Sequence, residues 1–342
     1  MRPVVMPPNR LAHFYLGGEA ITRLRQVPAP ADRSPEEWLA STTTRHGDVS
    51  IGLSSLPDGR LLRDAVQAEP ELWTGRPTSA GGPGDVGVLV KLLDAGQRLP
   101  VHVHPSRTFA TDHLGSCYGK TEAWYVVETA DPSAQVFLGF REDVSADDLL
   151  RAVEAQDSDW MLERMHAIPV QPGDVILVPA ETAHAIGAGI FLVEIQEPSD
   201  FSLLLEWTGF ATVDDAFLGL DQDRWVSMVQ HTATSADSVA ALSRHVDLQR
   251  RSGELIPLLP PAADPFFRAD LLAPAADSAV HVPAGFAVVV TVAGAGRLTY
   301  SDGDLALSSG DVLAVPHATG DWQVQGDVTA VVCRPASPGE AP

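Results

Sequence analysis

The segment Val101-His102-Val103-His104 constrains the fold most, because it alternates valine with histidine. In an extended strand, side chains at positions i and i+2 point to the same face of the sheet. His102 and His104 therefore project together, and the two valines face the other way. Two imidazoles on one face form half of a site for zinc, or for another divalent ion such as manganese, iron or nickel. Ordinary half-buried strand histidines are the alternative interpretation at this point.

Two glycine-led segments support the metal interpretation. Gly96 stands six residues before the first of these histidines, and Gly173 opens an apolar run that ends at Pro179, with His184 five residues beyond. This spacing resembles the two motifs of the cupin barrels, although Glu181 stands where a glycine usually follows the proline. A metal site then requires further strands to bring His184 and a carboxylate into the same interior.

Charge and cysteine content limit the partners that we expect. The formal charge of −22 and the lack of a basic patch argue against nucleic acid and against anionic membrane surfaces. No run approaches the roughly 18–20 apolar residues that a membrane span needs, and the first residues do not resemble a signal peptide. Cys117 and Cys333 are far apart and give no disulfide framework, which fits a reducing compartment. We therefore expect a cytoplasmic protein with a small-molecule partner.

Short apolar runs between Gly and Pro turns dominate the chain and predict a mainly β fold. Residues 145–166 instead predict two helices, divided near Asp157, and residues 213–256 also have a helical pattern. A short helix is predicted from Ser34, because serine can cap a helix and Glu37 follows three residues later. The proline-rich residues 257–261 predict a linker.

The segment Gly310–Pro316 repeats the pattern of Gly173–Pro179 and indicates internal duplication. The second copy is followed by His317 but has no His-x-His and no strand glutamate. We therefore predict two cupin (jelly-roll) barrels with a helical insert. Residues 1–212 would hold the N-terminal region and the metal-binding cupin, with the inserted helices at about 145–166. Residues 213–256 would form a helical segment, and residues 257–342 a cupin without metal.

Longer motifs within residues 35–210 resemble the type I mannose-6-phosphate isomerases, which are zinc-dependent two-cupin enzymes. The motifs are Gly119-Lys120-Thr121-Glu122-Ala123-Trp124-Tyr125, His184-Ala185-Ile186-Gly187-Ala188-Gly189 and Glu194-Ile195-Gln196. The resemblance implies interconversion of mannose 6-phosphate and fructose 6-phosphate through an enediolate. It also implies that the zinc ligands are His102, His104, Glu122 and His184.

The chain departs from this family pattern in two places. His102 stands where the family commonly has glutamine, and histidine can still bind the metal. Leu203 and Leu204 occupy the region where the family has an arginine tied to catalysis. Another basic residue must substitute for that arginine, or the substrate differs. Besides Lys120, the basic residues near the motifs that could bind a phosphate are Arg98, Arg107 and Arg141.

Three further residues are candidates for roles in the reaction. Lys120 precedes Glu122 by two residues, and its ammonium form is disfavoured beside a divalent cation, so it could act as the base. Glu194 is a second candidate base or an inward hydrogen-bonding group, and Trp124 could form a wall of the pocket. The alternatives are a solvated loop lysine, a structural carboxylate and a core tryptophan.

Two other functions stay open at this level. The missing arginine favours a metal cupin that acts on another sugar, phosphorylated or unphosphorylated, or that carries out different chemistry. The third alternative is a catalytically inactive bicupin that binds a sugar. Turnover of mannose 6-phosphate with and without a chelator separates these functions.

Overall fold

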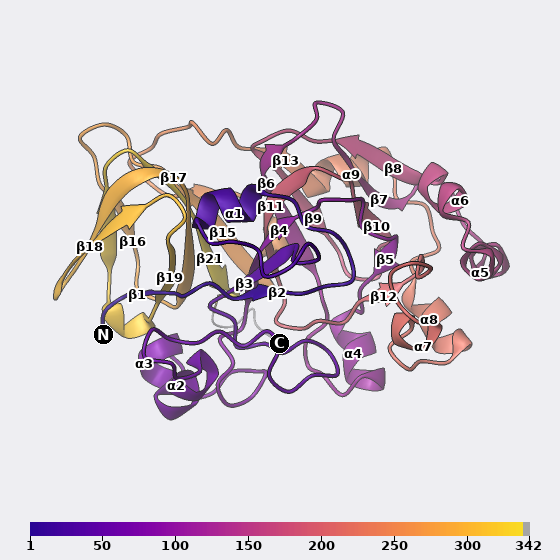
Figure 1. Ribbon diagram of the computed structural model, residues 1–342, viewed down its shortest axis with the longest axis horizontal. Helices are drawn as coiled ribbons and strands as arrows, with labels where there is room; N and C mark the ends of the chain where they lie inside the picture. Colours follow the sequence, from indigo (N-terminus) through magenta and orange to yellow (C-terminus); the bar gives the residue numbers. More distant parts are fainter. Residues whose placement is uncertain (338–342) are drawn as a thin grey trace.

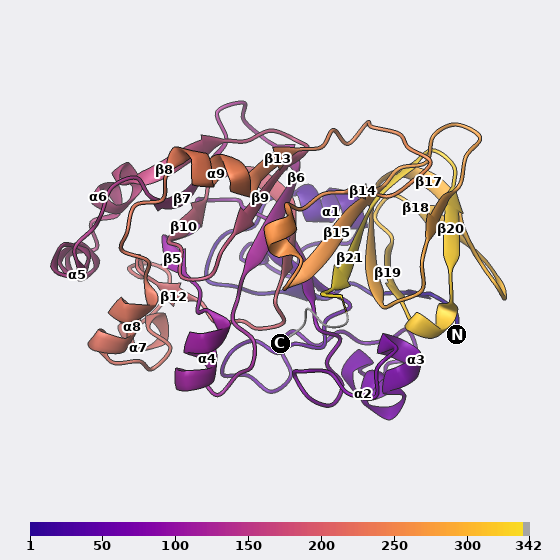
Figure 2. The ribbon, with the colours of Figure 1, turned by 180° about the vertical axis from the view of Figure 1, so that it is seen from behind.

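The computed structural model describes residues 1–337 and shows a mainly β protein with helices at its edges (Figure 1). In that part of the chain the strands form sheets of nine, seven and five strands. The seven-stranded sheet packs against the five-stranded sheet through one core cluster and against the nine-stranded sheet through another. The view from behind shows the nine-stranded sheet and helices α5 to α8 at opposite ends of the molecule (Figure 2).

The strands pair antiparallel within each sheet. The seven-stranded sheet contains β13 (Ser243–His245), β9 (Asp174–Val178), β6 (Glu122–Thr129), β11 (Ile190–Gln196), β4 (Leu89–Asp94), β3 (Glu36–Leu39) and β2 (Arg10–Leu11), in that order. The five-stranded sheet contains β12 (Leu203–Leu204), β5 (His102–Val103), β10 (His184–Ile186), β7 (Gln135–Phe140) and β8 (Met165–Pro169). The nine-stranded sheet contains β1 (Val4–Val5), β14 (Ile256–Pro257), β15 (Phe267–Leu272), β16 (Val280–Val282), β17 (Ala287–Tyr300), β18 (Gly303–Ser308), β19 (Val312–Val315), β20 (Trp322–Gln325) and β21 (Val328–Pro335).

The helices lie outside the sheets (Figure 1). Helices α5, α6 and α8 contribute to a core cluster that covers the outer face of the five-stranded sheet. Their bounds are α1 (Ala20–Arg25), α2 (Leu62–Ala68), α3 (Pro70–Thr74), α4 (Arg107–His113), α5 (Ala146–Ala155), α6 (Ser158–Glu163), α7 (Val213–Ala216), α8 (Gln222–Met228) and α9 (Ala236–Leu242), with 3-10 turns η1 (Pro261–Ala263) and η2 (His317–Thr319). No helix of residues 1–337 is long and apolar enough to cross a membrane.

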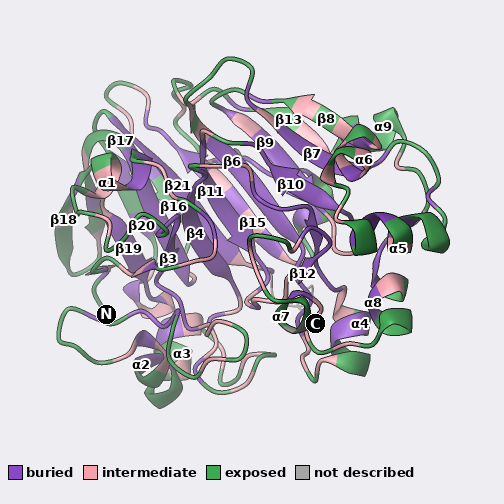
Figure 3. Cartoon of the chain, turned by 45° about the vertical axis from the view of Figure 1, so that its right-hand side comes forward, coloured by how far each residue is buried: buried purple, intermediate pink, exposed green. Residues whose placement is uncertain are grey.

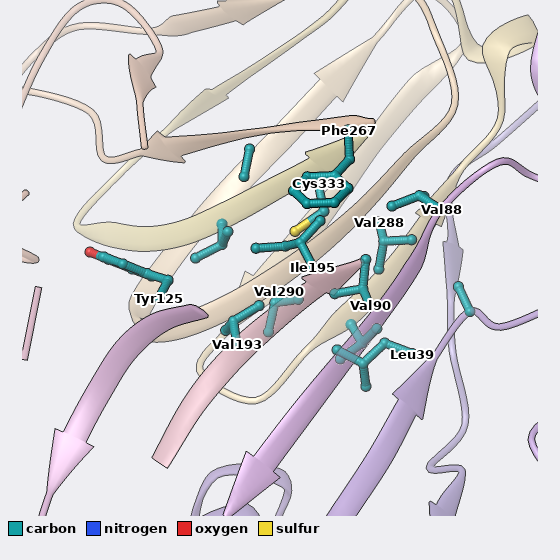
Figure 4. Packing of buried hydrophobic residues seen from close by; sticks show 14 of the residues in the cluster. Leu39, Val88, Val90, Tyr125, Val193, Ile195, Phe267, Val288, Val290 and Cys333 are labelled. Atoms are coloured by element: carbon teal, nitrogen blue, oxygen red, sulfur yellow. The ribbon is translucent and has the colours of Figure 1, made fainter. Parts of the chain in front are cut away.

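The seven-stranded sheet is covered on both faces, which explains its continuous apolar strands. All seven residues of β11 are buried, and its side chains alternate between the two neighbouring cores. Val193 and Ile195 pack toward Val290 and Cys333 of the nine-stranded sheet (Figure 4). On the other face, Leu192 belongs to the core shared with the five-stranded sheet. Burial is accordingly concentrated in the middle strands, whereas α5 and β18 at the two ends are largely exposed (Figure 3).

The inserted helices predicted at about 145–166 are present as α5 and α6. In the segment predicted to be helical at 213–256, helices α7, α8 and α9 lie within residues 213–242, whereas residues 243–245 form strand β13 and Ile256 begins strand β14. The helix predicted from Ser34 is wrong, because Glu36–Leu39 is the buried strand β3. The capping signal is local, and it is overridden because both glutamates of this strand find buried cationic partners, Lys91 and Arg25.

The linker predicted at residues 257–261 is also wrong. Ile256–Pro257 forms strand β14, paired with β15, and the side chains of Leu258 and Leu259 that follow are buried in the main core. Two further pairings cross the predicted segments. Strand β1 joins β19 of the C-terminal sheet, and β13 joins β9 of the central sheet. Two of the segments predicted from sequence therefore each contribute a strand to a sheet formed mainly by another segment.

Candidate metal centre

Four predicted ligands converge between the seven- and five-stranded sheets. His102 on β5 and His184 on β10 are direct cross-strand partners, and their ring centroids are 4.1 Å apart. His104 follows β5, and Glu122 is the first residue of β6 on the facing sheet. All four are buried, and one ligand atom from each lies within 4.8 Å of the others. Thus the alternation of His102 and His104 places both rings in the same interior, as predicted.

Backbone carbonyls fix the tautomer of the three imidazoles. Each Nδ1 is 2.8 Å from a carbonyl oxygen: that of Pro100 for His102, Phe201 for His104 and Thr182 for His184. A carbonyl only accepts, so each Nδ1 carries the hydrogen and each Nε2 keeps its lone pair. This arrangement of outer hydrogen bonds is typical of metal-binding histidines.

The charge states of the cluster also suit a cation. Burial lowers the pKa of His102 well below its ordinary value, and burial together with the nearby Lys120 charge lowers the pKa of His104 to about 3. Burial alone would raise the pKa of Glu122, but Lys120 and His104 hold that pKa well below its usual range. His102 and His104 therefore offer neutral imidazoles, and Glu122 offers an ionised carboxylate, near neutral pH.

One buried atom of the cluster lacks a protein partner. His184 Nε2 has no hydrogen-bond partner within residues 1–337, although Glu122 Oε1 lies 3.4 Å away. Buried polar atoms are nearly always paired, so this orphaned lone pair indicates a group that the protein chain does not supply. Three nitrogen donors and one carboxylate fit a divalent metal ion in that place.

Trp124 and Lys120 surround Glu122 from two sides. Trp124 Nε1 donates to Glu122 Oε1 at 3.0 Å, and Lys120 Nζ lies 3.1 Å from Oε2. Lys120 Nζ is also 2.8 Å from His104 Nε2. Trp124 is fully buried in the core, so it orients the carboxylate from behind and does not form a pocket wall, in contrast to the prediction.

The cluster opens into a cavity of about 810 Å³, which is large enough for a sugar phosphate. His102, Lys120 and Glu122 line one part of this cavity. Glu194 lines it from β11, and Leu204 lines it from β12. The leucine in the region where the resemblance implies an arginine thus presents an apolar side chain to the cavity.

Glu194 belongs to a buried charged group that sequence reasoning recognised only in part. Lys91 on β4 is its cross-strand partner, with Nζ 3.0 Å from Glu194 Oε1 and 3.4 Å from Glu36 Oε2. Burial, opposed by Lys91, raises the pKa of Glu194 to about 7. Lys91 carried one sequence signal, since it interrupts an otherwise apolar strand.

The predicted phosphate-binding arginines lie elsewhere. Among the described residues that line the cavity, none is Arg98, Arg107 or Arg141. Each is engaged instead: Arg98 makes a bidentate pair with Glu206 at 2.6 Å, Arg107 binds Glu197 at 2.6 Å, and Arg141 donates to the carbonyl of Glu163. The structure brings together the ligand candidates, Lys120 and Glu194, but not these arginines.

The N-terminal residues supply cavity walls that no sequence signal identified. His13, Tyr15 and Arg45 all line the cavity, together with Asp200. They come from irregular segments without hydrophobic periodicity, so their position depends on the tertiary fold.

Known proteins with similar sequence or structure identify the family. No family model matches the chain. A mannose-6-phosphate isomerase of Streptococcus mutans is 30% identical over 315 residues, which cover 92% of this chain and 93% of that protein. The chain belongs to the mannose-6-phosphate isomerase family. A second member, a probable mannose-6-phosphate isomerase of Bacillus subtilis, is 34% identical over 182 residues, 52% of this chain and 54% of that protein.

Solved structures of the family share the fold. The mannose 6-phosphate isomerase from Bacillus subtilis superposes with a TM-score of 0.76 at 20% identity, covering 98% of this chain and 100% of that chain. A variant of the phosphomannose isomerase from Salmonella typhimurium gives a TM-score of 0.74 at 17% identity, with the same coverage. The structural similarity extends over both the part that holds the four proposed metal ligands and the C-terminal nine-stranded sheet.

Proposed function

We propose that the protein is a metal-dependent aldose–ketose isomerase that interconverts mannose 6-phosphate and fructose 6-phosphate through an enediolate. The observation that carries this proposal is the convergence of three histidines and Glu122 beside a sugar-sized cavity, which His102 and Glu122 line. Membership of the mannose-6-phosphate isomerase family supports the substrate.

We propose zinc as the metal, with His102, His104, Glu122 and His184 as its ligands. Neutral imidazole nitrogens and a carboxylate are common zinc donors, although other divalent ions accept the same set. A bound divalent ion would supply a Lewis acid that stabilises negative charge on the sugar oxygens. A substrate in the cavity would meet the metal site from the side that His102 and Glu122 line.

The isomerisation moves a proton between C2 and C1 and develops negative charge on a sugar oxygen, and we assign roles in these two processes to Glu194 and Lys120. A carboxyl with a pKa of about 7 exists in both forms near neutral pH, so Glu194 can accept a proton and return it. Lys120 Nζ, within 3.1 Å of Glu122 Oε2, is placed to stabilise an oxyanion beside the metal ligands. Both side chains are buried and line the cavity.

We further propose that the strands form two cupin barrels. The five- and seven-stranded sheets face each other around a shared core, and the C-terminal strands enclose a separate apolar core. The division into residues 1–212, 213–256 and 257–342 is retained as a proposal for the main segments. Two strands pair across these boundaries: β1 pairs with β19 of the C-terminal segment, and β13 pairs with β9 of the first segment.

An isomerase assay with the metal-loaded and the chelated protein tests the function. Mannose 6-phosphate is offered as substrate, and fructose 6-phosphate is measured through a coupled reaction. We expect turnover with metal, loss of turnover on chelation and recovery when zinc is restored. Absence of turnover in the fully metal-loaded protein would contradict the proposal.

Leu204 favours one second candidate, an isomerase of an unphosphorylated aldose. An apolar side chain lines the cavity in the region where the family has an arginine, which removes one cation from the site. The same assay with unphosphorylated mannose separates the two functions. A kcat/KM higher for mannose than for mannose 6-phosphate would establish the second candidate.

A further inference from the structure

We propose that Arg45 binds the phosphate of the substrate. Arg45 would supply the positive charge that Leu204, on the wall of the same cavity, does not. This inference rests on the proposed function and deepens it, because it assigns a residue to the anionic end of the sugar phosphate. Arg45 was not among the residues predicted to bind phosphate. It lies in an irregular loop far from the metal-ligand motifs in sequence.

The first argument is that Arg45, unlike the other basic side chains lining the cavity, is not paired with a carboxylate of the described residues. Apart from histidines, the basic residues that line the cavity in the described part of the chain are Lys91, Lys120 and Arg45. Lys91 lies between two carboxylates, and Lys120 lies beside Glu122. Arg45 makes no ion pair within residues 1–337, and its guanidinium donates to the carbonyl oxygen of Ala12. It therefore keeps donors and a full charge for an anion, which a guanidinium can bind in a bidentate manner.

The second argument is that the loop holding Arg45 is fixed before any ligand arrives. The Arg45 amide donates to the carbonyl of Ile51 at 2.8 Å, and its own carbonyl accepts from Asp48 at 3.0 Å. The His46 amide donates to Asp200 Oδ2 at 3.1 Å, and the His46 ring packs against Phe201 with centroids 5.2 Å apart. A loop held at these points loses little conformational entropy when it binds an anion.

The third argument links this loop to the metal cluster. Asp200 holds the loop, and the next residue, Phe201, accepts a hydrogen bond from His104 Nδ1 at 2.8 Å through its carbonyl. One short segment thus positions both a proposed metal ligand and the Arg45 loop. A substrate whose reacting carbons and phosphate lie at opposite ends needs two anchors at a fixed separation, which this connection provides.

An unpartnered buried atom lies at the same end of the cavity. His13 follows Ala12, the residue that Arg45 contacts, and its Nδ1 is buried without a hydrogen-bond partner within residues 1–337. Its Nε2 lies 3.6 Å from Glu36 Oε1. His13 itself lines the cavity together with Arg45, so this end of the cavity carries a second polar side chain beside the guanidinium.

Steady-state kinetics of Arg45→Gln with mannose 6-phosphate tests the inference. We expect KM to rise about 10- to 100-fold, as for loss of a charge-assisted bidentate contact, with kcat within about threefold. Inorganic phosphate should inhibit the original enzyme competitively, and its inhibition constant should rise by a similar factor in the variant. For Arg45→Lys, both constants should lie between those of the original enzyme and those of Arg45→Gln. Lysine keeps the positive charge but cannot make the bidentate contact of a guanidinium.

Arg33→Gln is a matched control. Arg33 is an exposed arginine that also donates to a backbone carbonyl, that of Phe14, and it does not line the cavity among the described residues. We expect its KM to match that of the original protein. Circular dichroism and the melting temperature establish that each variant is folded.

The outcomes separate this inference from the proposed function. If the enzyme converts mannose 6-phosphate and Arg45→Gln leaves KM and phosphate inhibition unchanged, the Arg45 assignment is overturned and the function stands. If the metal-loaded protein has no such activity, titration calorimetry with mannose 6-phosphate decides. Binding that Arg45→Gln weakens at least tenfold upholds the assignment without the function, and no binding, or equal binding by both proteins, overturns both.

Discussion

Two glycine-led segments of this chain start from the same sequence pattern and end in different environments. After Pro179, strand β10 directs His184 into the group of four proposed metal ligands between two sheets. After Pro316, His317 begins the 3-10 turn η2 and lies half-buried beside Gly75, at the end of α3. The glycine, the apolar strand and the proline therefore specify a strand and a turn. They do not specify a ligand.

The interior around the C-terminal strands is apolar, whereas the interior that contains His184 includes buried charges. The C-terminal strands enclose a core of apolar side chains such as Leu313 and Val332. The N-terminal interior buries charged groups, including Lys91, Glu122 and Glu194. Desolvation makes buried charges expensive, and such groups with shifted pKa values cluster at functional sites. The comparison assigns the chemistry to the first region and packing to the second.

Removing the two corresponding histidines tests this contrast most strongly. We expect His184→Ala to lower turnover of mannose 6-phosphate by at least about 1000-fold and to lower metal content, because it removes an inward-facing donor. His317→Ala should leave turnover within about twofold. Equal losses in the two variants would show that the regions do not divide the work in this way.

Truncation in the C-terminal core should affect stability and leave metal binding intact. Leu313 is fully buried, so Leu313→Ala is expected to lower the free energy of unfolding by about 2–5 kcal/mol. Denaturant titration measures this loss, and elemental analysis of the folded fraction should give unchanged metal per chain. Loss of metal from folded Leu313→Ala would contradict a purely packing role.

Two of the buried tryptophans, one in each region, sharpen the comparison further. Trp124→Phe keeps the ring and removes the N–H that binds Glu122, so we expect metal affinity to fall about 10- to 100-fold. Trp322 is buried in the C-terminal core, and its Nε1 has no hydrogen-bond partner within the described residues. Trp322→Phe should leave metal affinity unchanged in a competition titration with a chelating dye.

A pH profile gives the smallest of these effects. The pKa of Glu194 is raised to about 7, so a base at this position is protonated, and inactive, below that pH. We expect kcat/KM to rise with pH up to about 7 and to fall about tenfold for each unit below it. In Glu194→Gln this dependence should disappear from the residual rate; persistence of the same slope would assign it to another group.

The sequence predicts the cluster well, because its information is local. The strand alternation at His102 and His104 fixes a shared face, and the motifs around Glu122 and His184 mark the other ligands. Local signals fail where tertiary contacts decide. The cap at Ser34 predicts a helix, but Glu36 is drawn into a buried strand by Lys91.

Long-range contacts explain why the rest of the site could not be predicted. The Arg45 loop reaches the cavity through a hydrogen bond between His46 and Asp200, 154 residues apart in sequence. No periodicity or spacing near Arg45 indicates that contact. In the reverse direction, Arg98 and Arg107 lie near the motifs in sequence, but buried glutamates hold both of them.

Metal content measured together with activity tests the central claim most directly. Elemental analysis and the isomerase assay are applied to the purified protein and to Glu122→Gln, which keeps the shape of the side chain and removes its charge. We expect about one divalent ion per chain and turnover of mannose 6-phosphate in the original protein, and loss of both in the variant. Full activity in protein stripped of metal, or in metal-free Glu122→Gln, would contradict the claim.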